Sequence, residues 1–286
     1  MGFDLHSLHF LKEVSHLISM GEVITLGRQG IHADQSYIDK IFLKNNIKTN
    51  DFSEKLLTNN LGAKNVYSLD ASNYQGCDIL HDLNLPIDER LSEKYDTLID
   101  GGTLEHIFNI PIALQNISKL VKLNGHILHM LPANNFCGHG FYQFSPELFY
   151  QYYSSPYFEI KRMYVIDTSK SDGWYIVKRP LPGVRLNIKS SSPIYVYCLV
   201  QKIQSQSNDY CIQQSDYLDT WENLDSNLLD ESKNTDKFTR SHKIITQLKK
   251  IGLYNILKFI REYLGFSKSY ISNSHPFLKW SKFKKN

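Results

Sequence analysis

The sequence predicts an α/β protein with a doubly wound, mostly parallel sheet of seven strands. Short apolar segments that suit buried strands alternate along the first half of the chain with segments of helical apolar spacing. Several of the strand-like segments end in acids or glycines, at the edge where open α/β sheets bind ligands. With 286 residues, 42% of them hydrophobic, the chain is long and apolar enough for one large packed domain.

The parallel strands and their crossover helices are predicted in the first half of the chain. Strand-like segments span residues 22–27, 66–70, 78–82, 95–100 and 126–131. Helical spacing predicts helices at residues 7–19, near 34–45, at 52–61 and at 110–123, the last ended by Asn124-Gly125. Strands and helices in this order form βαβ units.

Later segments complete the predicted sheet. Residues 145–153 suit a helix that begins with a Ser-Pro-Glu cap. Residues 158–167 and 193–203 alternate well enough to form an antiparallel pair of strands. The excursion between these strands contains Trp174 and two prolines, and it is predicted to be a surface insertion.

Charge divides the chain into an acidic domain and a basic tail. The net charge is +3, but the last 46 residues hold ten Lys or Arg against one acid, so they carry +9 and the rest carries −6. The predicted organisation is a domain at 1–203, a polar linker at 204–240, and a basic amphipathic helix (242–264) with its tail at 241–286. The tail suits a solvated helix or contact with an anionic membrane surface, whereas the acidic domain makes nucleic acid an unlikely partner.

The remaining composition points to the cytoplasm. No apolar run is long enough to cross a membrane, and polar residues interrupt the N-terminal segment where a signal peptide would need its apolar stretch. The four cysteines are not spaced as a disulfide framework or a zinc knuckle. The sequence leaves the oligomeric state open.

The predicted strand ends suit a nucleoside ligand. A carboxylate after the second strand of such a sheet can accept hydrogen bonds from ribose hydroxyls, and Asp70 has that position. Asp82 follows the third strand. The turn after the first strand contains Gly27 and Gly30 but lacks the Gly-x-Gly-x-x-Gly spacing, so NAD is disfavoured.

Three segments resemble a known family. They are the fourth strand with its Leu-Glu-His turn (95–106), the segment Asp-Leu-Asn-Leu-Pro (82–86), and the helix, Asn-Gly and strand that follow (111–128). Over about residues 20–165 the chain resembles the class I S-adenosylmethionine-dependent methyltransferases, type 11 branch, whose fold is Rossmann-like. The resemblance implies S-adenosylmethionine as cofactor. It implies ribose binding by Asp70 beside Ala71, adenine binding by Asp82 and Leu83, and a wall beside the sulfonium made of Asp100, Gly101 and Gly102.

The first-strand turn departs from that family. The family pattern is an acid, one residue, then Gly-x-Gly-x-Gly, and here only Gly27 matches. Gln29 stands in place of the second glycine and Ile31 in place of the third, which narrows the room for the methionine moiety. Arg28 is expected to offset part of the resulting loss of cofactor binding by pairing with the methionine carboxylate. The long interval between Gly27 and Asp70 implies an inserted helix.

Catalytic candidates follow the fourth and fifth strands. His139 lies between two glycines in a loop and is the first candidate for a base, because an imidazole titrates near neutral pH. Tyr142 is expected to orient the acceptor. Glu105 and His106 suit either direct chemistry or a capping role. A metal site made of Glu105, His106 and His139 is a weaker alternative, and no metal is expected.

The sequence thus predicts S-adenosylmethionine-dependent methyl transfer to a small molecule or saccharide intermediate. Similar Gly-His-Gly-Phe-Tyr-Gln-Phe-Ser-Pro segments occur in bacterial methyltransferase-like proteins linked to surface polysaccharides, which suggests a role in polysaccharide biosynthesis. The alternative is a non-catalytic member that keeps the fold as a binding or scaffold protein. The altered glycine turn favours this alternative, and the acids at the strand ends favour the enzyme.

Overall fold

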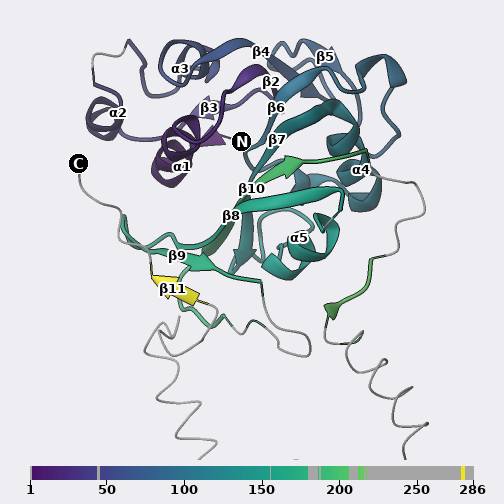
Figure 1. Cartoon of the computed structure of the whole chain (residues 1–286). Helices are drawn as coiled ribbons and strands as arrows, with labels where there is room; N and C mark the ends of the chain where they lie inside the picture. Colours follow the sequence, from purple (N-terminus) through teal and green to yellow (C-terminus); the bar gives the residue numbers. More distant parts are fainter. Residues whose placement is uncertain are drawn as a thin grey trace, which may run out of the picture.

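The computed structural model describes residues 2–43, 46–154, 156–179, 186, 188–205, 212–215, 217 and 278–280 (Figure 1). The helix predicted at 242–264 and most of the linker predicted at 204–240 lie outside these residues. Among the helices described, none is both long enough and apolar enough to cross a membrane.

A nine-stranded mixed sheet forms the centre of the described fold, in the order β11-β9-β8-β10-β7-β6-β2-β4-β5. Its strands are β2 (Gly21–Leu26), β4 (Ala63–Asp70), β5 (Ile79–Leu80), β6 (Tyr95–Asp100), β7 (Val121–Asn134), β8 (Phe158–Asp167), β9 (Trp174–Val177), β10 (Ile194–Lys202) and β11 (Leu278–Trp280). The strands from β5 to β7 pair in parallel, and β10, β8, β9 and β11 continue the sheet in antiparallel pairs. The predicted α/β class and the largely parallel centre are therefore confirmed.

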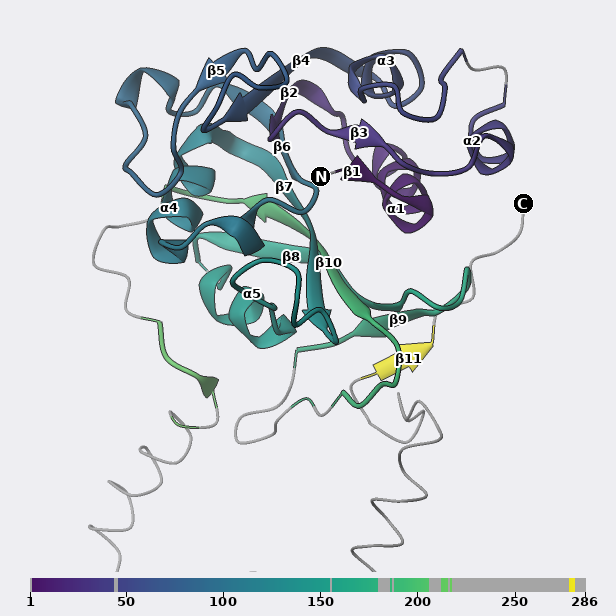
Figure 2. The same cartoon turned by 180° about the vertical axis from the view of Figure 1, so that it is seen from behind.

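Helices cover both faces of the sheet (Figures 1 and 2). They are α1 (Leu5–Ser15), α2 (Gln35–Ile41), α3 (Glu54–Asn59), α4 (Ile110–Leu120) and α5 (Pro146–Tyr152). Adjacent strand residues contribute to opposite faces: Val23 packs with the helices α1 to α3, and Ile24 packs with α4 and α5. The chain is thus doubly wound, with a separate apolar core on each face.

The strand order reverses between β2 and β6. From β2 the chain winds outward through β4 and β5, then crosses back to β6 and β7 on the other side. In open α/β sheets such a reversal opens a crevice beyond the carboxyl ends of the two strands, where ligands bind. Here that place is bordered by the Gly27 turn and by Asp100-Gly101-Gly102.

An additional small sheet brings the N-terminus to this edge. Strand β1 (Gly2–Phe3) pairs in parallel with β3 (Gly30–Ile31), directly after the β2 turn. Asp4 then caps α1 by accepting a hydrogen bond from the amide of Ser7. The predicted insertion between Gly27 and Asp70 is present as β3 and α2, which lie ahead of α3.

The prediction that the segment after β8 is a surface insertion is wrong at Trp174. This side chain is fully buried at the start of β9, where its ring contacts the rings of Phe10, Tyr164 and Tyr197. Burial of so large a ring against aromatic neighbours adds β9 to the sheet. With β11 paired to β9, the sheet has nine strands rather than the predicted seven.

The boundary between α4 and β7 also differs from the prediction. Helix α4 ends at Leu120 instead of Leu123, and β7 begins at once with Val121. The buried Lys202 ammonium explains this early end, because it donates hydrogen bonds to the carbonyls of Ser118 (2.9 Å) and Val121 (2.8 Å). A cation at these free carbonyls satisfies the last turn of the helix.

Candidate functional site

The strand register brings the predicted site segments to one edge of the sheet. Leu26 on β2 is level with Leu69 on β4 and with Asp100 on β6. Asp70 is level with Leu80 on β5. The residues that follow these pairs, including Gly27 and Gly101, therefore emerge side by side, as the sequence predicts for parallel strands.

Acids line the β4 and β5 ends of this edge. Asp70 is half-buried, and its Oδ1 accepts a hydrogen bond from the amide of Ser72 at 3.1 Å. Asp82 is exposed, and hydrogen bonds from the backbone and side chain of Asn84 lower the pKa of its carboxyl. Leu83 is buried and Ala71 is exposed. Two carboxylates on neighbouring strand ends can accept hydrogen bonds from a polyhydroxylated ligand.

The β2 turn is closed by its own hydrogen bonds. Gly27 has φ 68°, a conformation that glycine adopts without strain, and its amide donates to the carbonyl of Leu69 at 2.7 Å. Thr25 donates its hydroxyl to the carbonyl of Gly27. The buried Gln29 amide group donates to the carbonyl of Leu26, and Gln29 Oε1 has no hydrogen-bond partner among the described residues.

Gly101 is covered by protein on its outer side. A Cβ placed on Gly101 would lie 2.8 Å from Gln29 Oε1 and 2.8 Å from Cε1 of Phe3. Phe3 is fully buried. The predicted wall beside a sulfonium is therefore in contact with Gln29 and Phe3, at the reversal point of the sheet.

Arg28 differs from its predicted role. Its Nε lies 2.6 Å from Glu54 Oε1, and its Nη1 donates to the carbonyl of Gln75 at 2.8 Å. The guanidinium also lies over the ring of Phe52, 3.9 Å from its centroid. Arg28 thus ties the β2 turn to α3 and to the loop after β4, and its guanidinium is already paired with the carboxylate of Glu54.

Asp100 is an interior residue instead of a wall residue. It is fully buried, with its Oδ1 accepting from the amide of Thr103 and its Oδ2 lying 2.8 Å from His129 Nδ1. His129 Nε2 in turn lies 2.7 Å from the hydroxyl of Tyr153 on α5's C-terminal side. Asp100 and His129 stand level on the neighbouring strands β6 and β7, a register that the sequence alone does not give.

Three of the predicted catalytic candidates lie close together, namely Glu105, His106 and His139. We call them the Glu-His-His cluster. Glu105 Oε1 lies 3.5 Å from His139 Nε2 and 3.9 Å from His106 Nε2. The Glu105 side chain is 1% exposed, against 43% for His106 and 56% for His139. Burial, helped by the charge of Asp100, raises the pKa of Glu105 to about 8, while burial and His139 lower the pKa of His106.

Glu105 also organises the loop after β7. Its carbonyl accepts hydrogen bonds from the amides of Phe141 (2.7 Å) and Tyr142 (3.2 Å). The Tyr142 hydroxyl donates to the carbonyl of Phe108 at 2.8 Å. Tyr142 therefore joins the two loops that carry the cluster. Its hydrogen bond to Phe108 competes with the contact to an acceptor that was predicted for its hydroxyl.

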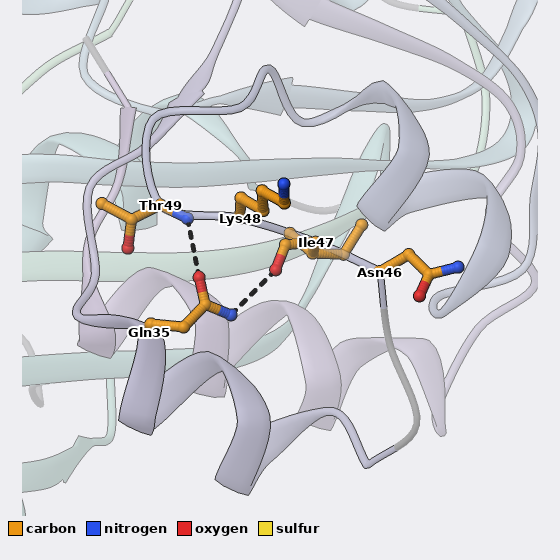
Figure 3. Close-up of a pocket in the computed structure, with 5 residues that line it drawn as sticks. All are labelled: Gln35, Asn46, Ile47, Lys48 and Thr49. Carbon is orange, nitrogen blue, oxygen red and sulfur yellow. Dashed lines mark hydrogen bonds between the residues drawn. The ribbon is translucent and has the colours of Figure 1, made fainter.

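A shallow hollow lies elsewhere, in the insertion after β3. It is lined by Gln35 of α2 and by residues 46–49, and Gln35 binds both sides of that loop (Figure 3). Its Nε2 donates to the carbonyl of Ile47 and its Oε1 accepts from the amide of Thr49. Lys48 is the one charged residue of this lining, so the hollow offers few side chains that could act as an acid, a base or a metal ligand.

Comparison with known proteins gives matches of fold alone. No family model matches the chain, and no curated protein matches it. Solved structures that align with it include an N1-methyltransferase of 1,6-didemethyltoxoflavin from Burkholderia thailandensis, with S-adenosylhomocysteine bound (TM-score 0.38, 10% identity, 69% of this chain and 78% of that chain). The N-methyltransferase NodS from Bradyrhizobium japonicum, also with S-adenosylhomocysteine, aligns with TM-score 0.38 and 10% identity over 70% of this chain and 86% of its own. The [4+2]-cyclase SpnF aligns with TM-score 0.40 and 8% identity over 69% of this chain and 80% of its own.

Proposed function

We propose that the chain is an S-adenosylmethionine-dependent methyltransferase that binds the nucleoside half of its cofactor at the ends of β4 and β5. The register that places Asp70 beside Leu80, next to the reversal of strand order, carries this proposal. Asp70 and Asp82 supply carboxylate acceptors for the ribose and the adenine. When bound, the cofactor supplies the methyl group.

The described residues fit the two halves of that cofactor unequally. Among the described residues, none donates a hydrogen bond to Asp70 Oδ2, and Leu83 gives the neighbouring strand end a buried apolar side chain. At the methionine half, Gln29 and Phe3 contact Gly101. The proposal therefore requires the end of the Gln29 side chain, which a hydrogen bond to the carbonyl of Leu26 holds, to leave Gly101 when the cofactor binds.

The acceptor is proposed to bind beside the Glu-His-His cluster. His139 presents an exposed imidazole there, suited to take a proton from a hydroxyl or amine. Phe108 and Phe141 follow the two histidines by two residues each and are 71% and 68% exposed, with their rings 6.0 Å apart. An open aromatic pair beside a base supports a small molecule or a saccharide intermediate as the acceptor.

A non-catalytic binding protein is the second candidate, and the covered Gly101 favours it. Phe3 lies in the apolar core under α1, so moving it would cost packing free energy that moving Gln29 would not. In this candidate the edge binds a nucleoside, or nothing, and no methyl donor enters.

Titration calorimetry with S-adenosylhomocysteine tests the proposal. The wild-type chain should bind one equivalent, and Asp70→Ala should weaken binding at least about tenfold, because it removes hydrogen bonds to a charged acceptor. Asp39→Ala, an exposed acid on α2, is the matched control and should bind as the wild type does. If the wild type gives no heat at millimolar ligand, the methyltransferase proposal fails. Binding of adenosine without binding of S-adenosylhomocysteine would support the second candidate.

A further inference from the structure

The Glu-His-His cluster gathers three donor atoms of the kinds that bind transition metals. One carboxylate oxygen of Glu105 and one ring nitrogen each of His106 and His139 all lie within 4.8 Å of one another. The residues come from two separate segments, a 3-10 turn after β6 (Leu104–His106) and the loop after β7. Hydrogen bonds from that loop to the Glu105 carbonyl hold the two segments together.

We propose that Glu105, His106 and His139 bind one divalent transition-metal ion, with Zn²⁺ as the best-suited ion and one coordination position left open. This proposal is independent of S-adenosylmethionine binding, since the cluster would bind the ion with or without the cofactor. It replaces the sequence-based expectation that no metal is bound.

The separations suit a tetrahedral ion after a small adjustment. Ligand bonds of about 2.0–2.1 Å in a tetrahedron place neighbouring donor atoms about 3.4 Å apart. The Glu105 Oε1 to His139 Nε2 distance is 3.5 Å, and the corresponding distance to His106 is 3.9 Å. The imidazole rings of His106 and His139 stand at 66° to each other with centroids 5.2 Å apart, so the rings do not stack, and one nitrogen of each ring lies within 4.8 Å of the other.

Burial of Glu105 is the second observation that points to a ligand. Its side chain is almost completely buried, and its Oε2 has no hydrogen-bond partner among the described residues. Burial of a carboxylate oxygen without a hydrogen bond costs free energy, and a cation bound to the carboxylate would offset that cost. Asp100, whose charge acts on Glu105, is already engaged by His129 and the amide of Thr103, so it adds negative potential without adding a ligand.

Two glycines leave room for the cluster. A Cβ at Gly102 would stand 3.2 Å from Glu105 Oε1, and one at Gly140 would stand 2.9 Å from Cγ of Glu105. Both residues also have positive φ, 95° and 78°, which favours glycine. Because the side chains of His106 and His139 are 43% and 56% exposed, the fourth position would face solvent. Three protein ligands with an open fourth position is the arrangement of catalytic rather than structural zinc sites.

Calorimetric titration of the full chain with Zn²⁺, after removal of metals with EDTA, tests the site. The wild type should bind one equivalent through the cluster. His106→Ala and His139→Ala, which change exposed side chains and leave the fold intact, should each weaken that binding more than about 100-fold, because loss of a ligand exceeds the effect of losing an outer partner. His16→Ala, an exposed histidine at the end of α1, is the matched control and should leave it unchanged.

Co²⁺ provides a readout of geometry. The wild type should develop the visible absorption of tetrahedral Co²⁺, and Glu105→Gln should lose it while circular dichroism shows the same folded content. Equal Zn²⁺ binding by the wild type, His106→Ala and His139→Ala, or no binding by the wild type, would overturn the proposal. Loss of S-adenosylhomocysteine binding with Zn²⁺ binding retained would instead count against the proposed function alone.

Discussion

Asp100 and His129 illustrate, at the scale of single residues, what a linear pattern hides. The sequence marks Asp100 as a strand-end acid, and the structure buries both Asp100 and His129 completely. The resemblance to class I methyltransferases implies instead that Asp100 belongs to a wall beside the sulfonium. Its side chain turns inward because a buried imidazole on the next strand offers a partner that the sequence does not reveal.

His129→Leu should lower the free energy of unfolding by about 3 kcal/mol, because it leaves the buried Asp100 carboxylate without its interior partner. Urea denaturation followed by circular dichroism measures this. In an Asp100→Asn background the same substitution should cost clearly less, since no buried carboxylate is then left unpaired. Equal costs in the two backgrounds would show that the pair is not coupled.

Gln29→Gly should raise the affinity for S-adenosylhomocysteine by about tenfold, because it removes the side chain that contacts Gly101. Gln29→Met keeps the side-chain length and should give no gain. Calorimetry compares the variants. An unchanged affinity in Gln29→Gly would mean that Gln29 does not limit entry of the methionine moiety.

At the scale of elements, most strands could be predicted because apolar runs of four to eight residues are local signals. Residues 95–100 form β6 as predicted, and β8 and β10 pair antiparallel as predicted. The end of α4 could not be predicted, because Lys202, far along the chain, satisfies its last carbonyls. The 3-10 turn that positions Glu105 has no apolar period, so Glu105 and His106 were predicted from the resemblance of the Leu-Glu-His turn, and His139 from its position between two glycines.

Lys202→Met should cost about 2 kcal/mol of unfolding free energy, because the carbonyls of Ser118 and Val121 would stay buried without a donor. Thermal and urea unfolding measure the loss. Lys64→Met, at an exposed pair with Glu22, is the control and should change stability by less than about 0.5 kcal/mol. A similar small change for Lys202→Met would refute its role in ending α4.

At the scale of the whole molecule, the two extra strands could not be predicted from local pattern. The apolar run 174–177 lies between polar and proline-containing segments, and for this reason the sequence predicted a surface insertion there. The structure shows instead that Trp174 is buried against Phe10 of α1. About a hundred residues of chain separate β9 from its partner β11, and the local sequence does not indicate that these two strands pair. The predicted boundary of the domain at residue 203 stays a prediction.

Removal of residues 204–286 should leave the sheet folded and expose β9 as its edge. Amide hydrogen exchange should then accelerate in 174–177, which loses its β11 partner, and stay slow in β8 and β10, which remain paired on both sides. Mass spectrometry of peptides from the full and shortened chains measures the difference. Fast exchange throughout the shortened chain would show that the domain does not end near 203.

The claim on which the account depends is that a nucleoside cofactor binds where the strand order reverses. A crystal structure of the full chain grown with S-adenosylhomocysteine tests it most directly. The account predicts the ribose on Asp70, the adenine beside Asp82 and Leu83, and the Gln29 side chain turned away from Gly101. A structure grown at saturating ligand that shows no density at this edge, with Gln29 and Phe3 still on Gly101, would contradict it.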